Sequence, residues 1–202
     1  GGGSEMLIGT DSGLRRRSRI GAPWTGVPGL DGTSVRAVVS AADDGWWIGT
    51  LSGLWRLHGD GRLVAIDGLR DPRIDALLRV DDALWVGTRG GLERLQAGRV
   101  APDPVLAPLA GDMITTLVRD LDGTLLIASN TRGLWRLDAG RLARIEPGGA
   151  GLYASVWALH PDADAIWAGT FGAGLYRIDR ATGTSTALSE RHGLTNNVVY
   201  RI

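Results

Sequence analysis

The chain contains no cysteine and no lysine, and only three of its 202 residues are histidine. Without cysteine it has no disulfide framework, and without lysine it has no Gly-Lys-Ser or Gly-Lys-Thr phosphate loop. The 22 basic residues are all arginine, and 22 acidic residues balance them. Zero net charge argues against a nucleic-acid partner, because neutralisation of phosphates dominates nucleic-acid binding.

Long apolar runs are missing too. No stretch approaches the roughly 20 residues that cross a membrane, and no secretory signal peptide is present. We therefore expect no membrane contact by this polypeptide itself. The opening Gly-Gly-Gly-Ser is typical of a linker or cloning remnant, so we separate residues 1–5 from a single domain over residues 6–202. The 31 glycines and the lack of helical patterning predict short strands joined by turns.

A unit of about forty residues occurs five times, which is the signature of a repeat architecture. Its core is Trp/Leu-x-Gly-Thr followed by Gly-Leu-x-Arg-Leu/Ile. The first half falls at Gly9, Gly49, Gly87, Ala128 and Gly169. The second half begins at Gly13, Gly53, Gly91, Gly133 and Gly174.

Each unit divides into four predicted strands, A to D. Strand A is apolar, and it is predicted at residues 35–38, 74–77, 114–117, 156–159 and 199–202. Strand B is the Trp-x-Gly-Thr segment and strand C is Gly-Leu-x-Arg-Leu. Strand D is weakest, and in the third unit it is interrupted by Pro102, Pro104 and Pro108, so D is predicted to be the outer strand.

Four-stranded antiparallel units at this period predict an all-β, five-bladed β-propeller. Residues 199–202 look like a strand A with no strand B after it, and residues 6–10 look like a strand B with no strand A before it. We therefore expect the C-terminal strand to complete the N-terminal blade and to close the ring, because closure removes two open sheet edges.

The segment from Gly193 to Ile202, Gly-Leu-Thr-Asn-Asn-Val-Val-Tyr-Arg-Ile, followed by Leu7-Ile-Gly-Thr-x-x-Gly-Leu14, resembles the two-component regulator propeller repeat. That repeat has the consensus Gly-Leu-Pro-x-Asn-x-Val, then Asp-x-x-Gly-x-Leu-Trp-Ile-Gly-Thr-x-x-Gly-Leu. The resemblance implies the extracytoplasmic sensor region of bacterial receptors such as hybrid histidine kinases, hence a periplasmic or extracellular location. It also implies signal transduction and, in some members, recognition of oligosaccharides.

The chain departs from that family in two ways. Such sensors usually have seven blades, whereas five units are present here, and kinase, cyclase and membrane segments are absent. The chain is therefore interpreted either as a compact five-bladed relative or as an excised or engineered piece with a structural or assembly role.

Internal comparison predicts a ligand site. The second position of strand A varies while its neighbours stay apolar: Arg36, Asp75, Thr115, Trp157 and Tyr200. We expect these residues to surround the mouth of the propeller channel, with aromatic rings stacking on a sugar and charged groups forming hydrogen bonds. The alternative is ordinary packing between blades together with an Arg–Asp pair.

Loops on the same face supply further candidates for contact with a ligand. These rim residues are Arg89, Asn130, Arg132, Phe171, Asn196 and Asn197. The alternative is that they are simply solvated loop residues.

Other patterns favour structural roles. The recurring Trp47, Trp85 and Trp167 are predicted to pack between blades. The arginine of each strand C is expected to stack on aromatic rings or to pair with acids. Two fragments that resemble part of a calcium loop, Asp120-x-Asp122-Gly123 and Asp162-x-Asp164, are read as hairpin turns because the other ligands are missing.

No catalytic, metal-binding or cofactor-binding constellation is evident, so we expect a non-enzymatic protein without cofactors. The leading hypothesis is a sensor-type module that binds a small polar ligand or oligosaccharide, or a scaffold that presents a surface to another protein. The alternatives are a purely structural propeller and a propeller lyase or hydrolase. A monomer is favoured, although a homo-oligomer stays open.

Overall fold

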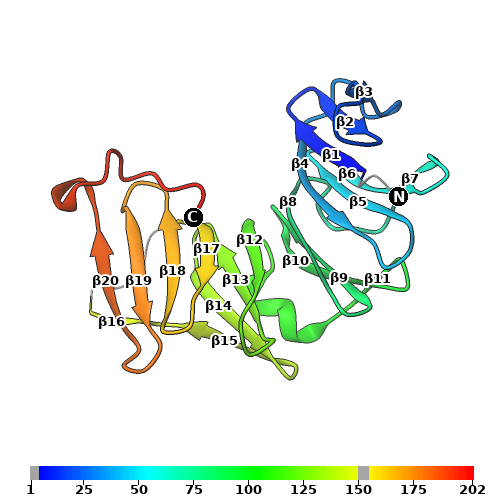
Figure 1. Cartoon of the computed structure of the whole chain (residues 1–202). Helices are drawn as coiled ribbons and strands as arrows, with labels where there is room; N and C mark the ends of the chain where they lie inside the picture. The colour runs from blue at the N-terminus through cyan, green and yellow to red at the C-terminus, as the bar shows by residue number, and fades with distance from the viewer. Residues whose placement is uncertain (1–4, 150–154) are drawn as a thin grey trace. The chain divides into compact units, whose positions relative to one another are not determined.

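The structure is a computed structural model that describes residues 5–149 and 155–202, and the described strands form five sheets (Figure 1). The first sheet contains β1 (Met6–Thr10), β2 (Gly13–Arg17) and β3 (Thr25–Gly26). The second contains β4 (Val35–Ser40), β5 (Gly45–Thr50), β6 (Gly53–His58) and β7 (Leu63–Ile66). The third contains β8 (Ile74–Val80), β9 (Ala83–Thr88), β10 (Gly91–Gln96) and β11 (Arg99–Ala101).

The remaining two sheets have the same antiparallel order. The fourth contains β12 (Ile114–Arg119), β13 (Leu125–Ser129), β14 (Gly133–Asp138) and β15 (Arg141–Ile145). The fifth contains β17 (Val156–Pro161), β18 (Ala165–Thr170), β19 (Leu175–Asp179) and β20 (Thr184–Leu188). A short extra strand, β16 (Gly148–Gly149), pairs in parallel with β20. The described residues also include two 3-10 helices, η1 (Pro104–Leu109) and η2 (Glu190–His192).

The predicted strand order is confirmed in four of the five units. β4, β8, β12 and β17 occupy the predicted A positions at one edge of their sheets, and β7, β11 and β15 form the opposite edge. In the third unit the proline-rich stretch ends strand D after three residues and continues as η1, which contains Pro104 and Pro108. Proline cannot donate a ladder hydrogen bond, so the short outer strand is the expected result.

The repeated Gly-Thr motif is explained by the turn between strands B and C. The threonine hydroxyl donates a hydrogen bond across the turn to the carbonyl of the next repeat glycine, at 2.8 Å from Thr10 and Thr50 and 2.9 Å from Thr88. Thr170 makes the same bond at 2.8 Å. These bonds lock the turn, so the hydroxyl recurs for a structural reason.

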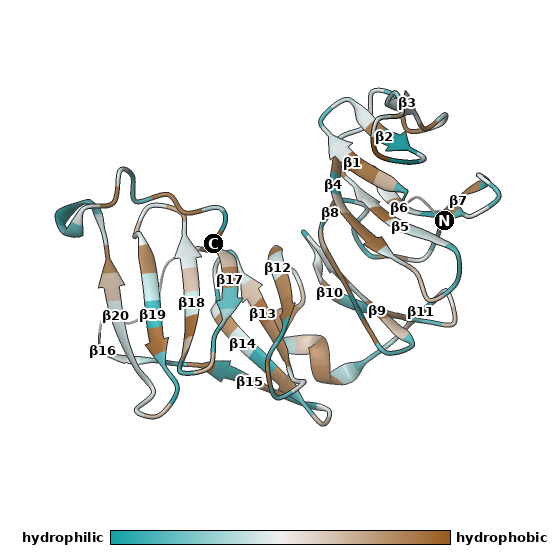
Figure 2. Ribbon diagram, in the orientation of Figure 1, coloured by the Kyte–Doolittle hydropathy of each residue, from teal (hydrophilic) through white to brown (hydrophobic). Residues whose placement is uncertain are grey.

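The hydrophobic core lies between successive sheets. Leu14 of the first sheet and Val27, which directly follows β3, pack with Val35 and Ile48 of the second sheet, and Leu54 packs with residues of the third. The fourth and fifth sheets share a similar cluster (Figure 2 shows hydrophobic stretches along these strands). Each sheet therefore relies on a neighbour to cover its apolar face.

Contacts within the chain divide it into two compact units. The first comprises residues 1–86 and 94–101, and the second comprises residues 87–93 and 102–202. Within the described residues, no helix has the length and apolar character needed to cross a membrane.

The two ends of the chain differ from the prediction. Residues 199–202 form no strand, and the neighbouring Val198 makes a single antiparallel bridge to Phe171. β1 is an edge strand that pairs with β2. Residues 199–202 are not assigned as a strand in the described structure. Their pairing with residues 6–10, which would close the ring, stays a prediction. The proposed linker at residues 1–4 lies outside the described residues, whereas Glu5 accepts a 3.0 Å hydrogen bond from Trp46.

The glycine of the Gly-Thr motif allows the next inner strand to approach closely. A β-carbon on Gly49 would lie 2.6 Å from a methyl carbon of Ile74, and the corresponding distance from Gly9 to Val35 is 2.7 Å. The same relation recurs between Gly169 and Val199, at 2.7 Å. Val199 therefore takes the position of the first residue of a further inner strand.

We expect Gly49→Ala to lower the free energy of unfolding by about 1–3 kcal/mol, because Ile74 must move to admit the new methyl group. The fourth sheet carries Ala128 at this position, so the spacing can adapt and folding should survive. The control is Gly26→Ala, whose β-carbon would meet only side-chain ends at 3.4 Å. Urea denaturation of both variants measures the difference, and equal stability would contradict this packing.

Candidate functional site

The variable position of strand A coincides with a β-bulge. The register between the first two strands shifts between Val35 and Ala37 in the second sheet and between Ile114 and Thr116 in the fourth. The fifth sheet has the same shift between Val156 and Ala158. The residues at these bulges are Arg36, Thr115 and Trp157. A bulge leaves its extra residue out of the ladder and redirects its side chain, which explains why this position tolerates so many residue types.

Three aromatic side chains gather in the second unit. Trp157 comes from β17, Phe171 follows β18, and Tyr200 lies near the C-terminus. The Trp157 and Tyr200 ring centroids are 5.6 Å apart at 86°. Phe171 lies 6.4 Å from Trp157 and 6.0 Å from Tyr200. Phe171 is 55% exposed and Tyr200 is 51% exposed. We call these three residues the aromatic cluster.

A polar chain orients the tryptophan of the cluster. The Trp157 indole Nε1 donates a 2.7 Å hydrogen bond to Ser155 Oγ, and that hydroxyl donates to Asn130 Oδ1. Sequence reasoning selected Asn130 but missed Ser155. Ser34 and Ser155 both stand one residue before a strand A, and this recurrence in the sequence could have identified Ser155. Ser34 likewise donates a 3.0 Å hydrogen bond to the preceding B–C loop, at Asp11.

The two predicted asparagines hold the loop that precedes Tyr200. Asn197 accepts the Glu190 N–H through Oδ1 at 2.8 Å, and its carbonyl accepts from Gly174 at 2.8 Å. Asn196 Oδ1 accepts the Val198 N–H at 2.8 Å. The side-chain oxygens of both residues are thus used in hydrogen bonds within the segment that precedes Tyr200.

Two other predicted residues make internal contacts in the second unit. Thr115 is buried, and its hydroxyl donates to the carbonyl of Val156 in the next sheet. The Arg132 guanidinium donates to the Pro108 carbonyl, and its Nε lies 3.9 Å from Asp112. These bonds connect neighbouring segments of the fold.

The first unit contains the predicted residues Arg36 and Asp75. Arg36 Nε lies 3.7 Å from Asp75 Oδ1, and its Nη1 lies 3.9 Å from Asp11. The Asp75 side chain is only 4% exposed, so the predicted Arg–Asp pair is present with its acid buried. The last predicted residue, Arg89, belongs to the second unit, where it is half-buried in the turn between β9 and β10. The candidate residues are therefore shared between the two units, and the structure brings together Trp157, Phe171 and Tyr200 in one and Arg36 and Asp75 in the other.

The arginine of strand C pairs with an acid near the start of strand B, as one of the two structural readings expected. The pairs are Arg16–Glu5, Arg56–Asp43, Arg136–Asp122 and Arg177–Asp164. Arg56 and Arg94 also stack on Trp47 and Trp85, at 5.1 and 5.7 Å from the ring centroids. Both predicted modes of contact are confirmed.

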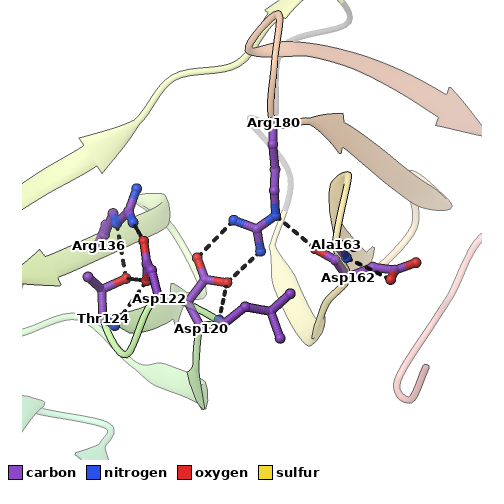
Figure 3. Close-up of polar contacts among 8 residues, drawn as sticks. Asp120, Asp122, Thr124, Arg136, Asp162, Ala163 and Arg180 are labelled. Atoms are coloured by element: carbon purple, nitrogen blue, oxygen red, sulfur yellow. Dashed lines mark hydrogen bonds and ion pairs between the residues drawn. The ribbon is translucent and has the colours of Figure 1, made fainter.

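The calcium-like segments are hairpin turns, and the carboxylates of Asp120 and Asp122 bind arginine (Figure 3). Arg180 of the fifth sheet donates through Nη1 and Nη2 to both oxygens of Asp120 in the fourth, at 3.1 and 2.5 Å. Its Nε donates to the Asp162 carbonyl at 2.8 Å. The Asp120 side chain is fully buried. Burial alone would raise the pKa of Asp120, but hydrogen bonds from Arg180 and Leu121 and nearby positive charge lower that pKa overall.

No protein-family model matches the chain, and no curated protein matches it. Among solved structures, the chain is similar to the extracellular domain of a putative one-component system from B. thetaiotaomicron, with 23% identity and a TM-score of 0.82. That match covers 98% of this chain and 28% of the other. The chain thus spans well under a third of that relative.

Two further structures share the fold. PorZ, a surface component of the type-IX secretion system of Porphyromonas gingivalis, has 15% identity and a TM-score of 0.70, covering 97% of this chain and 34% of its own. Virginiamycin B lyase from Staphylococcus aureus has 12% identity and a TM-score of 0.69, covering 92% of this chain and 73% of its own. At these identities the likeness shows the fold alone, and it confirms the all-β propeller architecture of five sheets.

We expect Asp120→Asn to lower the free energy of unfolding at pH 7 by about 1–3 kcal/mol, because Arg180 loses its charged partner. The lowered pKa of Asp120 contributes stability that is present above its ordinary value of 3.8 and is lost as pH falls through the folded-state value. The deficit of the variant should therefore shrink as pH falls below 3.8.

Thermal unfolding at a series of pH values measures this effect. The control is Asp164→Asn, because the Asp164 side chain is 74% exposed in its ion pair with Arg177. An exposed pair contributes about 1 kcal/mol or less. A deficit of Asp120→Asn that stayed constant down to acid pH would contradict the assignment.

Proposed function

We propose that this chain is a non-enzymatic sensor-type propeller region that binds a small polar ligand, an oligosaccharide, against the aromatic cluster. The observation that carries the proposal is the meeting of Trp157, Phe171 and Tyr200. These residues come from three separate segments and leave two of their rings half-exposed. Exposed aromatic side chains that gather in one place favour recognition over simple core packing.

The chemistry of the cluster suits a sugar. Aromatic rings bury a large area and interact well with flat apolar surfaces, such as the C–H face of a pyranose. Asn130 Oδ1 already accepts the Ser155 proton, so the amide Nδ2 of Asn130 can donate to a hydroxyl oxygen of the ligand. A ring surface beside an oriented amide combines stacking with a directional hydrogen bond.

The similar structure from B. thetaiotaomicron is the extracellular domain of a putative one-component system, and this supports a sensor role outside the cytoplasm. By the same reasoning we propose a periplasmic or extracellular location. The chain corresponds to 28% of that relative, so ligand binding here would be one part of a larger protein's activity.

We propose binding in preference to catalysis because of the groups around the cluster. Within the described residues, the Trp157 indole is hydrogen-bonded to the side chain of Ser155, which is in turn hydrogen-bonded to the side chain of Asn130. A hydroxyl and an amide orient a ligand, but they lack the acid–base pair that a lyase or hydrolase needs. The likeness to virginiamycin B lyase concerns the fold and brings no activity with it.

Trp157→Ala and Tyr200→Ala should each weaken the binding of an oligosaccharide at least about tenfold, since each removes a stacking surface. A thermal-shift screen against a panel of plant and microbial oligosaccharides identifies the ligand, and isothermal titration calorimetry then measures affinity. The control is Leu121→Ala, an exposed apolar residue (66%) in the β12–β13 turn. A screen without any hit, or unchanged affinity in both aromatic variants, would contradict the proposal.

A further inference from the structure

One face of the first sheet places two arginines among apolar side chains. In the β1–β2 register Met6 lies opposite Arg17 and Ile8 lies opposite Arg15. Because directly opposite residues point to the same side, these four residues share one face. The Arg17 guanidinium also lies 4.7 Å from the ring centroid of Trp24 and donates to the Met6 sulfur, with Nη2 at 2.9 Å. We call Met6, Ile8, Arg15, Arg17 and Trp24 the arginine face.

The arginine face is open in the described first unit. Ile8 is 46% exposed, and Met6 and Trp24 are 36% and 37% exposed. The opposite side of the same sheet is different, because Leu7 and Leu14 pack into the core shared with the second sheet. In Figure 2 the end of β2 is hydrophilic, in agreement with the arginine run. The sheet therefore has one buried side and one exposed side.

Comparison with the other sheets shows that this face is unusual. The position of Arg17 is occupied elsewhere by buried aliphatic residues: Leu57, Leu95, Leu137 and Ile178. The position of Arg15 is occupied by Trp55, Glu93, Trp135 and Tyr176. An apolar surface packed on the arginine face would strip water from two guanidinium groups without compensation, which is costly. A surface that covers this face must therefore supply carboxylates.

The last sheet of this chain does not offer such a surface. One side of the fifth sheet is equivalent to the side of the first sheet that carries Leu7 and Leu14. The pairing of β18, β19 and β20 places the following residues on that side: Trp167, Leu175, Arg177, Thr186 and Leu188. That side contains an arginine and no acid, although Asp164 and Asp179 pair with this arginine from the turns. Residues 199–202 likewise contain Arg201 and no acid.

We propose that the arginine face binds an acidic, extended segment of a partner protein in which carboxylates alternate with apolar side chains. In a strand added to β1, successive side chains point to opposite sides of the sheet. The carboxylates would therefore lie on the arginine face and pair with Arg15 and Arg17, and the apolar residues would lie on the other side, beside Leu7. β1 is an edge strand, so the backbone of an extended segment can add to it as a further strand. Such a partner fits better than nucleic acid because apolar side chains surround the arginines.

The test uses the full chain and two synthetic peptides long enough to span β1, one of alternating Val and Glu and one of alternating Val and Lys. Isothermal titration calorimetry should show binding of the Val-Glu peptide and none of the Val-Lys peptide. Arg15→Glu combined with Arg17→Glu should weaken Val-Glu binding at least about tenfold and allow Val-Lys binding, because the charge complementarity is reversed. If the double variant does not fold, Arg17→Gln alone should still weaken Val-Glu binding, because it removes one of the two positive charges.

The matched control is Arg19→Glu, an exposed residue of the same basic run that lies outside the sheet. It should change the affinity by no more than about twofold, as a rim charge does. Failure of the Val-Glu peptide to bind, or equal loss in Arg19→Glu, would overturn the proposal. Tighter binding of a single-stranded DNA oligonucleotide than of the Val-Glu peptide would overturn it in favour of nucleic acid.

Discussion

The contact between a glycine of one sheet and the first residue of the next inner strand sets the spacing of the repeat. Gly9 with Val35 and Gly49 with Ile74 are each so close that a β-carbon would collide with the neighbour. Close approach of the backbone lets the apolar side chains on either side interdigitate, and this is how small four-stranded sheets bury their faces. The core clusters between neighbouring sheets follow directly from that spacing.

The same inner strands also generate the candidate ligand site. A bulge directly after the packed first residue takes Arg36, Thr115 and Trp157 out of the regular ladder. The packed residue must stay apolar, whereas the bulged residue is free to change. Function can therefore diversify at this position without disturbing the contact between sheets, as the mixture of charged, hydroxyl and aromatic side chains illustrates.

Charge distribution separates the first sheet from the others. In the second, fourth and fifth sheets the strand C arginine forms an ion pair with an acid near the start of strand B. The residues on either side of that arginine are apolar. The first sheet keeps that pair as Arg16–Glu5 but adds Arg15 and Arg17 on its exposed side. These two extra guanidinium groups on an exposed side are the basis for the proposed acidic partner.

The amino-acid sequence by itself determined the repeat, the strand order and the outer position of strand D, because these depend on local patterning and on the restrictions of proline. It also identified the variable position of strand A and the Arg–Asp pair. It did not determine that Ser155 orients Trp157, that Thr115 and Arg132 bond internally, or that 199–202 lacks a strand partner. Those outcomes depend on which distant segments lie within hydrogen-bonding distance, and only the tertiary structure brings such segments together.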